Sequence, residues 1–317
     1  MSDIPFRRPV VIIGGLAQEH RGWVREFAIT LHAPVYAEAT SGLREDEALA
    51  SLAITSGERM LPRGGFDGVI RIGGVPTLRF WRDLDDSLRE VPVVSYSAVP
   101  FSGSSRGELH PMERLPRPAP RDRDEAFFAA DREQAARIAA ILDAEPLSEL
   151  AMVRRFSNEM QRGGRLFLGN SLPIREWDLV ASREPRGIEV GANRGANGID
   201  GQLSTFLGWC RPGPNYALVG DLTALYDLNA PWIIPQLDIA IGIRIFIINN
   251  GGGRIFSRVP ALRRIDGGVR DRIIENSHSL RFGAWAEMFG IEDSLIELLP
   301  DDDASRRVWA RYDEIWG

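Results

Sequence analysis

The chain has 317 residues, of which 44% are hydrophobic and 26% charged, so it is long enough for two domains that each bury a core. The formal net charge of -6 argues against a general nucleic-acid-binding or anionic-membrane surface, although a local pocket lined with arginine is compatible with it. A single cysteine rules out an internal disulfide, and no segment approaches the roughly 20 apolar residues that span a bilayer. We therefore expect a cytoplasmic protein without a membrane span.

In residues 1–113, sequence patterns typical of buried strands alternate with patterns typical of helices. Short β-branched runs such as "PVVIIGG" and "DGVIRIGG" end in glycine, and the amphipathic "QEHRGWVREFAITLH" follows the first of them. This order is typical of βαβ units, which form a parallel sheet covered on both faces. The glycine pair after the first run lacks the third glycine of a dinucleotide-binding loop, so we interpret it as a tight turn and assign it no cofactor.

A stretch rich in proline and charge, "HPMERLPRPAPRDRDE", indicates an exposed connection, which we place at residues 114–124. Residues 125–317 then begin with two helical segments and continue with the strands "RLFLGN", "GIEVGAN", "YALVGD" and "IRIFIINN". These signals predict an α/β protein with two doubly wound parallel-sheet domains. Ligands of such sheets bind at the carboxyl ends of the strands, and these four strands end in Asn or Asp.

Two of these strand ends carry the side chains of a possible metal site. Asp221 follows "YALVG" and Asn250 ends "IRIFIINN", and a right-handed crossover sets the two ends one or two strand spacings apart. Mg²⁺ prefers oxygen ligands and is usually held by one or two protein groups together with phosphate oxygens. The glycines at 251–253 would let a main-chain carbonyl reach the ion, and the first amides of the helix "LTALYD" would meet the phosphate. The alternative is that Asp221 only caps a helix and the glycines only make a turn.

Four motifs carry a resemblance to a known family, namely "GNSLPIREWD", "NRGANGIDGQLST", "GDLTALYDLNA" and "NNGGGRIFS". A Gly-Asp that opens a helix, with Asn-Asn some thirty residues later, resembles the thiamine-diphosphate motif of the decarboxylase and synthase superfamily. The sequences of the four motifs are similar to those of 2-succinyl-5-enolpyruvyl-6-hydroxy-3-cyclohexene-1-carboxylate (SEPHCHC) synthase, an enzyme of menaquinone biosynthesis. The resemblance covers nearly the whole chain, and it implies that residues 1–113 are the family's central domain and residues 125–317 its diphosphate-binding domain.

The resemblance also implies a cofactor site with thiamine diphosphate and Mg²⁺ or Mn²⁺. Asp221, Asn250 and the carbonyl of Gly252 would hold the metal ion. Ile199 would lie under the bent cofactor, although core packing is the alternative for this residue. The remaining cofactor contacts that we predict are Asn170, Ser171, Leu222, Thr223, Ile255 and Phe256. Ile255 and Phe256 would complete an apolar wall that favours loss of carbon dioxide, whereas a helix cap is the alternative role for Asn170 and Ser171.

In the family's reaction, 2-oxoglutarate loses carbon dioxide and the succinyl unit adds to isochorismate. Both substrates carry carboxylates, which arginine binds through two donors in one plane, so we predict that Arg175 and Arg194 bind substrate and, with Ile199, act in catalysis. Ser171 is a further candidate for substrate contact. Arg79 stands where the family tends to have a basic residue of the central domain, and a surface role is an equal alternative. The 4 histidines lack the spacing of metal ligands, and we interpret them as structural or surface residues.

Two features depart from the family. The printed sequence begins at the central domain, whereas the family begins with a pyrimidine-binding domain whose glutamate protonates the cofactor ring. We therefore expect an enzyme that needs a separate pyrimidine-domain chain, within a homo-oligomer or beside it. The alternatives are a non-catalytic cofactor-binding or assembly protein and another thiamine-dependent carboligase. In addition, "AWAEMFGIEDSLIELLPDDD" runs from a helix almost directly into the last strand, where the family has another helix, so we expect a thinner face of the sheet.

Overall fold

The computed structural model describes residues 4–105, 107–195, 197–238 and 240–317. The chain divides into two compact units. Unit 1 comprises Met1–Ala144, Ala181–Arg186 and Arg311–Gly317, and unit 2 comprises Glu145–Val180 and Gly187–Ala310. The helix at 125–144, which the sequence analysis places in the second domain, groups with unit 1, so the predicted boundary at 114–124 stays a prediction. Residues 1–3 and 106 of the predicted first domain, and Ala196 of the "NRGANGID" motif, lie outside the described residues.

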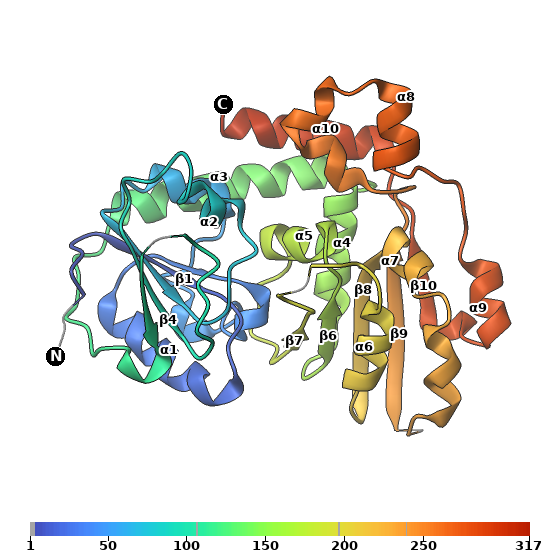
Figure 1. Cartoon of the computed structure of the whole chain (residues 1–317), viewed down its shortest axis with the longest axis horizontal. Coiled ribbons are helices and arrows are strands. Elements are labelled where there is room, and N and C mark those ends of the chain that lie inside the picture. Colours follow the sequence, from blue (N-terminus) through green and yellow to red (C-terminus); the bar gives the residue numbers. More distant parts are fainter. Residues whose placement is uncertain (1–3, 106, 196, 239) are drawn as a thin grey trace. The chain divides into compact units, whose positions relative to one another are not determined.

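Unit 1 is built on a five-stranded parallel sheet in the order β2-β1-β3-β4-β5 (Figure 1). Its strands are β1 (Pro9–Ile13), β2 (Val35–Ala37), β3 (Gly68–Ile72), β4 (Val93–Ser97) and β5 (Glu108–Pro111). Its α-helices are α1 (Gln18–Leu31), α2 (Arg79–Asp83) and α3 (Glu125–Ala144). Gly14, after β1, approaches Gly74 so closely that a Cβ would stand 2.4 Å from the Gly74 carbonyl oxygen, which accounts for glycine in this turn.

Strand β5 is a short edge strand that the sequence analysis does not predict. It pairs with β4, and its residues are exposed or half-buried. A strand of this kind carries no apolar run, so its sequence is similar to that of the exposed connection that follows it.

Unit 2 contains a second five-stranded parallel sheet, in the order β10-β9-β8-β6-β7. Its strands are β6 (Arg165–Leu168), β7 (Glu189–Gly191), β8 (Gly213–Gly220), β9 (Ile241–Ile248) and β10 (Leu295–Leu298). The remaining α-helices are α4 (Glu149–Glu159), α5 (Leu172–Val180), α6 (Gln202–Trp209), α7 (Asp221–Tyr226), α8 (Gly267–Val269), α9 (Gly283–Phe289) and α10 (Asp302–Ile315). The two sheets confirm the predicted α/β fold with two doubly wound parallel sheets.

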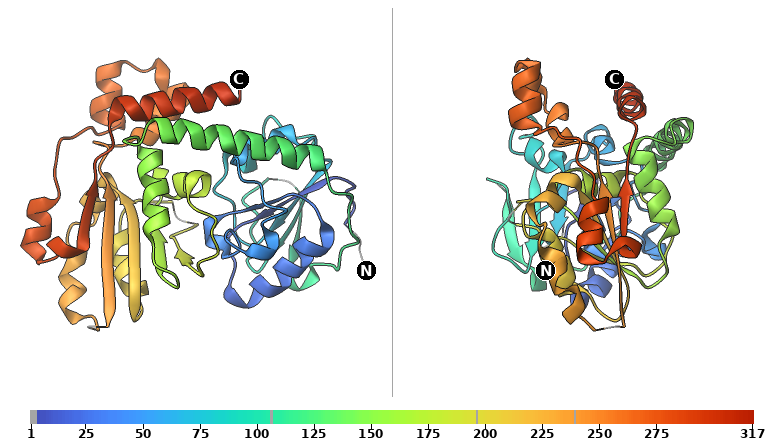
Figure 2. Two further views of the ribbon diagram at one scale, coloured as in Figure 1. Left: turned by 180° about the vertical axis from the view of Figure 1, so that it is seen from behind. Right: turned by 90° about the vertical axis from the view of Figure 1, so that its right-hand side faces the viewer.

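Alternate residues of β8 and β9 face two different layers of unit 2. Ala217 and Ile245 belong to an apolar cluster with α6 and α7. Tyr216 and Phe246, on the other face, contact Phe156 of α4. Helix α6 lies in front of the sheet in Figure 1, and α4 lies in front of it in the view from behind in Figure 2. Both faces are therefore covered, which explains why these strands have nearly continuous apolar runs.

The strand order sets the carboxyl ends of β6, β8 and β9 side by side. Strand β8 lies between the other two, and its last residue, Gly220, is in register with Ile248 of β9. The chain runs from β6 to β7 at one edge and from β8 through β9 to β10 at the other, so its direction across the sheet reverses between β6 and β8. Ligands of open α/β sheets bind at such a reversal. The predicted adjacency of the ends of "YALVGD" and "IRIFIINN" is confirmed.

Between α9 and β10 the chain has a short 3-10 turn, Glu292–Ser294, and these fully described residues contain no further α-helix. The predicted direct passage from helix to strand is therefore confirmed. No helix in the described part of the chain is both long and apolar enough to cross a membrane.

Candidate functional site

A cavity of about 100 Å³ lies where β6, β8 and β9 end. The predicted site residues that line it are Ser171, Ile199, Asp221, Leu222, Thr223, Asn250, Gly252, Ile255 and Phe256. The other lining residues, which are not among the predicted site residues, are Glu149, Leu172, Pro173, Gly220, Ile248, Gly253 and Arg254. Small-molecule pockets usually enclose about 300 to 1,000 Å³, so unit 2 by itself encloses only part of a ligand of ordinary size.

Asp221 is buried and joins the end of β8 to the turn after β9. Its Oδ2 atom accepts hydrogen bonds from the N–H groups of Gly251 at 2.8 Å and Gly252 at 2.9 Å, and Oδ1 accepts from the N–H of Leu222 at 2.6 Å. Burial raises the pKa of the Asp221 carboxyl above its usual value, while these hydrogen bonds and His278 lower it. Burial makes the charged form costly, so a bound cation would stabilise it.

The turn after β9 requires glycine. Gly252 has a φ of +135°, and a Cβ on it would stand 2.6 Å from the carbonyl oxygen of Glu275. Residues 275–278 support this turn from the outside. The N–H of His278 donates to the carbonyl of Gly251 at 3.1 Å, and the N–H of Gly253 donates to the carbonyl of Glu275 at 2.5 Å. The backbone at Gly252 is therefore held in place next to Asp221.

The side chain of Asn250 is oriented by Glu149. Its Nδ2 group donates to both carboxylate oxygens of Glu149, at 3.1 Å each. Its Oδ1 atom is buried and accepts no hydrogen bond from the residues that the structure describes. A buried acceptor without a partner costs roughly 1–3 kcal/mol, so a ligand that fills this position would stabilise the site.

These oxygen atoms suit a hard cation. The described ranges hold no group of three or more His, Cys, Asp or Glu side chains that could bind a metal ion. The predicted ligand set is of another kind, with a carboxylate of Asp221, an amide oxygen of Asn250 and a carbonyl of Gly252. Mg²⁺ usually takes one or two protein groups and completes its shell with water and phosphate oxygens. The buried Oδ1 atom of Asn250 and the buried carboxylate of Asp221 therefore fit Mg²⁺ better than a softer metal.

Two buried carboxyl groups, Glu149 and Glu176, adjoin this site and are not predicted from the sequence. Burial raises the pKa of Glu149 to about 7; hydrogen bonds from Asn250 and Glu176 lower it, and the charge of Asp221 raises it. Burial, followed by the charge of Glu149, raises the pKa of Glu176 well above its usual value. As a carboxylate, Glu176 would have no hydrogen-bond donor among the described residues. A proton on Glu176 avoids a buried carboxylate without a donor, and its O–H group supplies a hydrogen-bond donor to Glu149.

Asn170 and Arg194 contact each other beside the cavity. Asn170 is buried, and its Oδ1 atom accepts a hydrogen bond from Nη1 of Arg194 at 2.7 Å. Its backbone N–H donates to Oε1 of Gln202 at 2.9 Å, and its Nδ2 donates to the carbonyl of Gly198 at 2.8 Å. Neither Asn170 nor Arg194 lines the cavity, and their contacts with cofactor and substrate stay predictions.

Ser171 links the cavity to Arg175. Its backbone φ is +75°, in the left-handed region that residues other than glycine rarely adopt. Its carbonyl accepts a hydrogen bond from Nη1 of the exposed Arg175 at 2.5 Å. Ile199 and Ile255 are half-buried and Phe256 is 38% exposed, so all three present apolar surface to the cavity instead of being enclosed in the core.

His278 lies closer to the site than the sequence analysis expects of a structural or surface residue. Its Nε2 atom is 3.4 Å from Oδ2 of Asp221, and its side chain is 12% exposed. Its Nδ1 atom accepts a hydrogen bond from the N–H of Leu280 at 3.2 Å, which places a proton on Nε2, facing the carboxylate. No spacing rule identifies this histidine, because it reaches Asp221 from a loop 57 residues later in the chain.

Arg79 belongs to unit 1. It begins α2, its side chain is 66% exposed, and Nε lies 3.5 Å from Oδ1 of Asp83, one helical turn further on. Its predicted contact with substrate stays a prediction.

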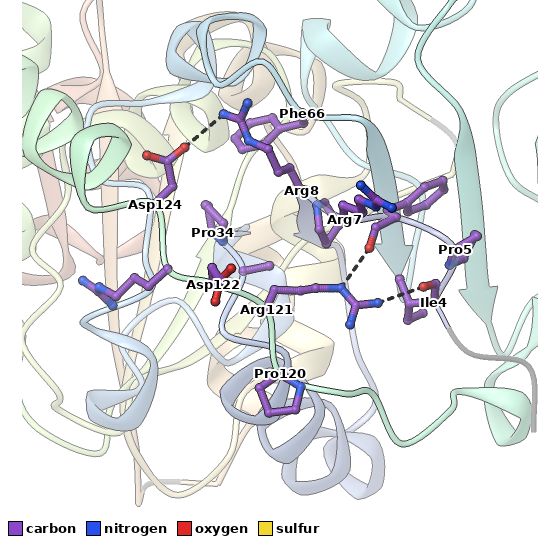
Figure 3. Close-up of a pocket in the computed structure, with 14 residues that line it drawn as sticks. Ile4, Pro5, Arg7, Arg8, Pro34, Phe66, Pro120, Arg121, Asp122 and Asp124 are labelled. Carbon is purple, nitrogen blue, oxygen red and sulfur yellow. Dashed lines mark hydrogen bonds and ion pairs between the residues drawn. The ribbon is translucent and has the colours of Figure 1, made fainter.

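A larger cavity, of about 650 Å³, lies in unit 1 (Figure 3). Arginines line it, and two of them, Arg8 and Arg121, bind other parts of unit 1. Arg8 pairs with Asp124 at 3.0 Å, and Arg121 donates to the carbonyls of Ile4 and Phe6, each at 2.9 Å (Figure 3). These arginines join the amino-terminal segment to residues 120–124. The size of this cavity therefore does not indicate a functional site, whereas the donor set of the smaller one does.

Comparison with protein-family models gives no match for this chain. Three curated relatives are each named 2-succinyl-5-enolpyruvyl-6-hydroxy-3-cyclohexene-1-carboxylate synthase. The protein from Bdellovibrio bacteriovorus is 39% identical over 98% of this chain and 62% of its own length. The protein from Akkermansia muciniphila is 38% identical over 95% of this chain and 61% of its own length. The protein from Chlorobium limicola is 32% identical over 86% of this chain and 49% of its own length. The chain thus spans about three fifths of the first two relatives.

Proposed function

Since this chain belongs to the SEPHCHC synthase family, we propose that it supplies the half of a SEPHCHC synthase active site that binds the diphosphate of thiamine diphosphate. The proposed enzyme decarboxylates 2-oxoglutarate and adds the succinyl unit to isochorismate, in the cytoplasm, as a step of menaquinone biosynthesis. The observation that carries this proposal is the grouping of Asp221, Asn250 and Gly252 around one cavity at the ends of two neighbouring strands.

The metal-binding part of the proposal rests on the donor atoms. Mg²⁺ or Mn²⁺ would be held by the carboxylate of Asp221, Oδ1 of Asn250 and the carbonyl of Gly252, with diphosphate oxygens in the remaining positions. A cation would stabilise two of these groups, the Asp221 carboxylate and Oδ1 of Asn250. The Asp221 carboxyl is buried with a raised pKa, and Oδ1 of Asn250 is buried without a hydrogen-bond donor among the described residues. When bound, thiamine diphosphate supplies the electron sink that the decarboxylation needs.

The surrounding side chains would exclude water and bind the substrates. Ile199, Ile255 and Phe256 present apolar surface to the cavity, which disfavours water and favours a step that disperses charge. Arg175 and Arg194 would bind the carboxylates of 2-oxoglutarate and isochorismate through paired donors. The hydrogen bonds of Arg175 to Ser171 and of Arg194 to Asn170 fix both guanidinium groups beside the end of β6.

A second protein domain would complete the site. Tyr226, at the end of α7, is 62% exposed and Trp232, in the 3-10 helix Ala230–Gln236, is 73% exposed. Both residues lie in the segment that begins with α7, whose first residues line the cavity, and large exposed apolar side chains are typical of a protein interface. We propose that a pyrimidine-binding domain, from a separate chain or another subunit of an oligomer, covers this surface and supplies the glutamate that activates the cofactor.

Isothermal titration with thiamine diphosphate, in the presence and absence of MgCl₂, tests the proposal. We expect binding that requires the metal ion, and loss of this binding in Asp221→Ala. Asp227→Asn is the matched control, because Asp227 is another buried carboxylate of unit 2 and binds Ser204 instead of lining the cavity. Binding that is equal without metal would refute the ligand assignment. Consumption of 2-oxoglutarate after addition of a pyrimidine-domain protein then distinguishes an enzyme from a non-catalytic cofactor-binding protein.

A further inference from the structure

An asparagine side chain can offer either of two ends to a ligand. The Oδ1 end accepts hydrogen bonds and binds cations, whereas the Nδ2 end donates hydrogen bonds and repels them. The two ends have nearly the same shape, so packing alone does not select one of them. At Asn250 the selection comes from Glu149, which accepts from Nδ2 with both carboxylate oxygens at 3.1 Å and leaves Oδ1 without a donor among the described residues.

Glu149 is itself held at a fixed position. It is the first residue of α4, whose N-cap residue Ser148 accepts a hydrogen bond from the N–H of Ala151 at 3.3 Å. The backbone N–H of Glu149 donates to Oγ of Ser305 at 3.0 Å. The amino terminus of this 11-residue helix favours negative charge on the Glu149 side chain. The acceptor for Nδ2 of Asn250 is therefore set by the fold before any ligand binds.

We propose that Glu149 is a positioning residue for the cation site, which fixes the Asn250 side chain with Oδ1 available to the metal ion. This inference rests on the proposed function, since the ion is the one assigned there to Asp221, Asn250 and Gly252. Glu149 does not bind the ion itself. It removes one of the two orientations that Asn250 could adopt, so that the metal ligands are arranged before the ion arrives. Replacement of residues that orient metal ligands typically costs 10- to 100-fold in metal affinity.

Mn²⁺ binding, followed by electron paramagnetic resonance of the free ion with saturating thiamine diphosphate, tests the inference without any need for turnover. We expect Glu149→Leu to weaken Mn²⁺ binding 10- to 100-fold, because no acceptor is left for Nδ2. Glu149→Gln keeps one carbonyl acceptor, so we expect its affinity to stay within about threefold of the unmodified chain. Asp227→Asn, the control defined above, should leave the affinity unchanged.

A rescue experiment separates positioning from a general structural role. Aspartate at position 250 has an oxygen atom in place of both Oδ1 and Nδ2, so either orientation of its carboxylate presents an oxygen to the metal ion. We therefore expect Asn250→Asp to restore tight Mn²⁺ binding in the Glu149→Leu background. In the presence of Glu149 the same change places two carboxylates together, and we expect it to weaken binding. If Glu149→Leu does not fold, Glu149→Leu/Glu176→Leu replaces the whole buried acid pair by apolar side chains and allows the same comparison.

The outcomes also distinguish this inference from the proposed function. If the unmodified chain binds no Mn²⁺ with thiamine diphosphate, both are refuted. If the unmodified chain binds Mn²⁺ and Glu149→Leu binds it equally well, the site exists and the positioning role is refuted. Loss of binding in Glu149→Leu without rescue by Asn250→Asp also contradicts the positioning role, since a purely structural defect would have this effect.

Discussion

Nη1 of Arg194 donates a hydrogen bond of 2.7 Å to Oδ1 of Asn170. This contact joins the loop before α6 to a residue two positions after the end of β6. Because Asn170 also donates hydrogen bonds to Oε1 of Gln202 and to the carbonyl of Gly198, it fixes the path of the loop that carries Arg194 and Ile199. Asn170 therefore orients Arg194, the arginine that is proposed to bind substrate.

We expect Arg194→Lys to raise the KM for 2-oxoglutarate about tenfold in the enzyme assembled with its pyrimidine domain, because an ammonium group lacks the planar pair of donors. Asn170→Ala should raise this KM as well, since it releases Arg194. Steady-state kinetics of the double variant complete the cycle, and we expect its effect to be smaller than the sum of the two single effects. Strictly additive changes would show that the contact has no part in substrate binding.

The left-handed backbone of Ser171 predicts a reversal of the usual order of alanine and glycine. At a φ of +75° an alanine is strained by roughly 1–2 kcal/mol, whereas glycine is not. We expect Ser171→Gly to be more stable than Ser171→Ala by about 1 kcal/mol in urea unfolding. Ala136→Gly, at an exposed position in α3, is the control and should be destabilised by about 1 kcal/mol. Equal stability of the two Ser171 variants would mean that no strain is stored there.

Gly252→Ala should be among the most destabilising single changes in unit 2. Its Cβ would stand 2.6 Å from a backbone carbonyl, and its φ of +135° disfavours any side chain. Gly163→Ala is the matched control, because Gly163 has a φ of +70° and a Cβ there would meet nothing within 4 Å. We expect about 1 kcal/mol of destabilisation for the control and about 3 kcal/mol or more for Gly252→Ala, measured by urea unfolding. Similar losses for both would contradict the close contact with residue 275.

The acid pair predicts a decline of stability as the pH rises. The pKa of Glu149 rises from 4.5 to about 7 on folding, and that of Glu176 is also raised, so the folded state holds more protons than the unfolded state between these values. The stabilisation is fully present below pH 4.5 and is lost as the pH rises through about 7. Arg254 lowers the pKa of Glu149 and Arg258 lowers that of Glu176, but burial raises both pKa values by more.

Glu176→Gln removes one of these protonation steps and keeps a hydrogen-bond donor for Glu149. We expect the variant to gain stability relative to the unmodified chain as the pH rises from 5 to 8, by about 1 kcal/mol or more in urea unfolding. Parallel stability curves for the two proteins would contradict a proton held on Glu176.

Much of the fold and the proximity of Asp221 to Asn250 could be predicted from the sequence because their signals are local. Apolar runs mark β8 and β9, and the polar residues that follow them, Asp221 and Asn250, come together as soon as the two strands pair. Pro231 and Pro235 show the limit of such signals. The stretch from the predicted helix "LTALYD" to residue 236 forms two segments, α7 and a 3-10 helix, because proline cannot donate the hydrogen bond that a continuous α-helix needs.

The residues that the sequence analysis missed depend on contacts between distant segments. Glu149 contacts Asn250 across 101 positions of the chain, and in the sequence it is only one acidic residue in an amphipathic helix. His278 reaches Asp221 from a loop without regular spacing. Glu176 stands between an exposed arginine and a buried tryptophan, and only its complete burial reveals its unusual protonation. Neither composition nor periodicity carries this information.

A crystal of the chain soaked with thiamine diphosphate and MnCl₂, with the manganese located from its anomalous scattering, tests the claim that Asp221, Asn250 and Gly252 hold one metal ion. We predict one strong peak at the end of β8 and β9, about 2.1 Å from Asp221, from Oδ1 of Asn250 and from the carbonyl of Gly252, with diphosphate oxygens completing the shell. A peak elsewhere, or bound diphosphate without a metal ion between it and Asp221, would contradict the claim.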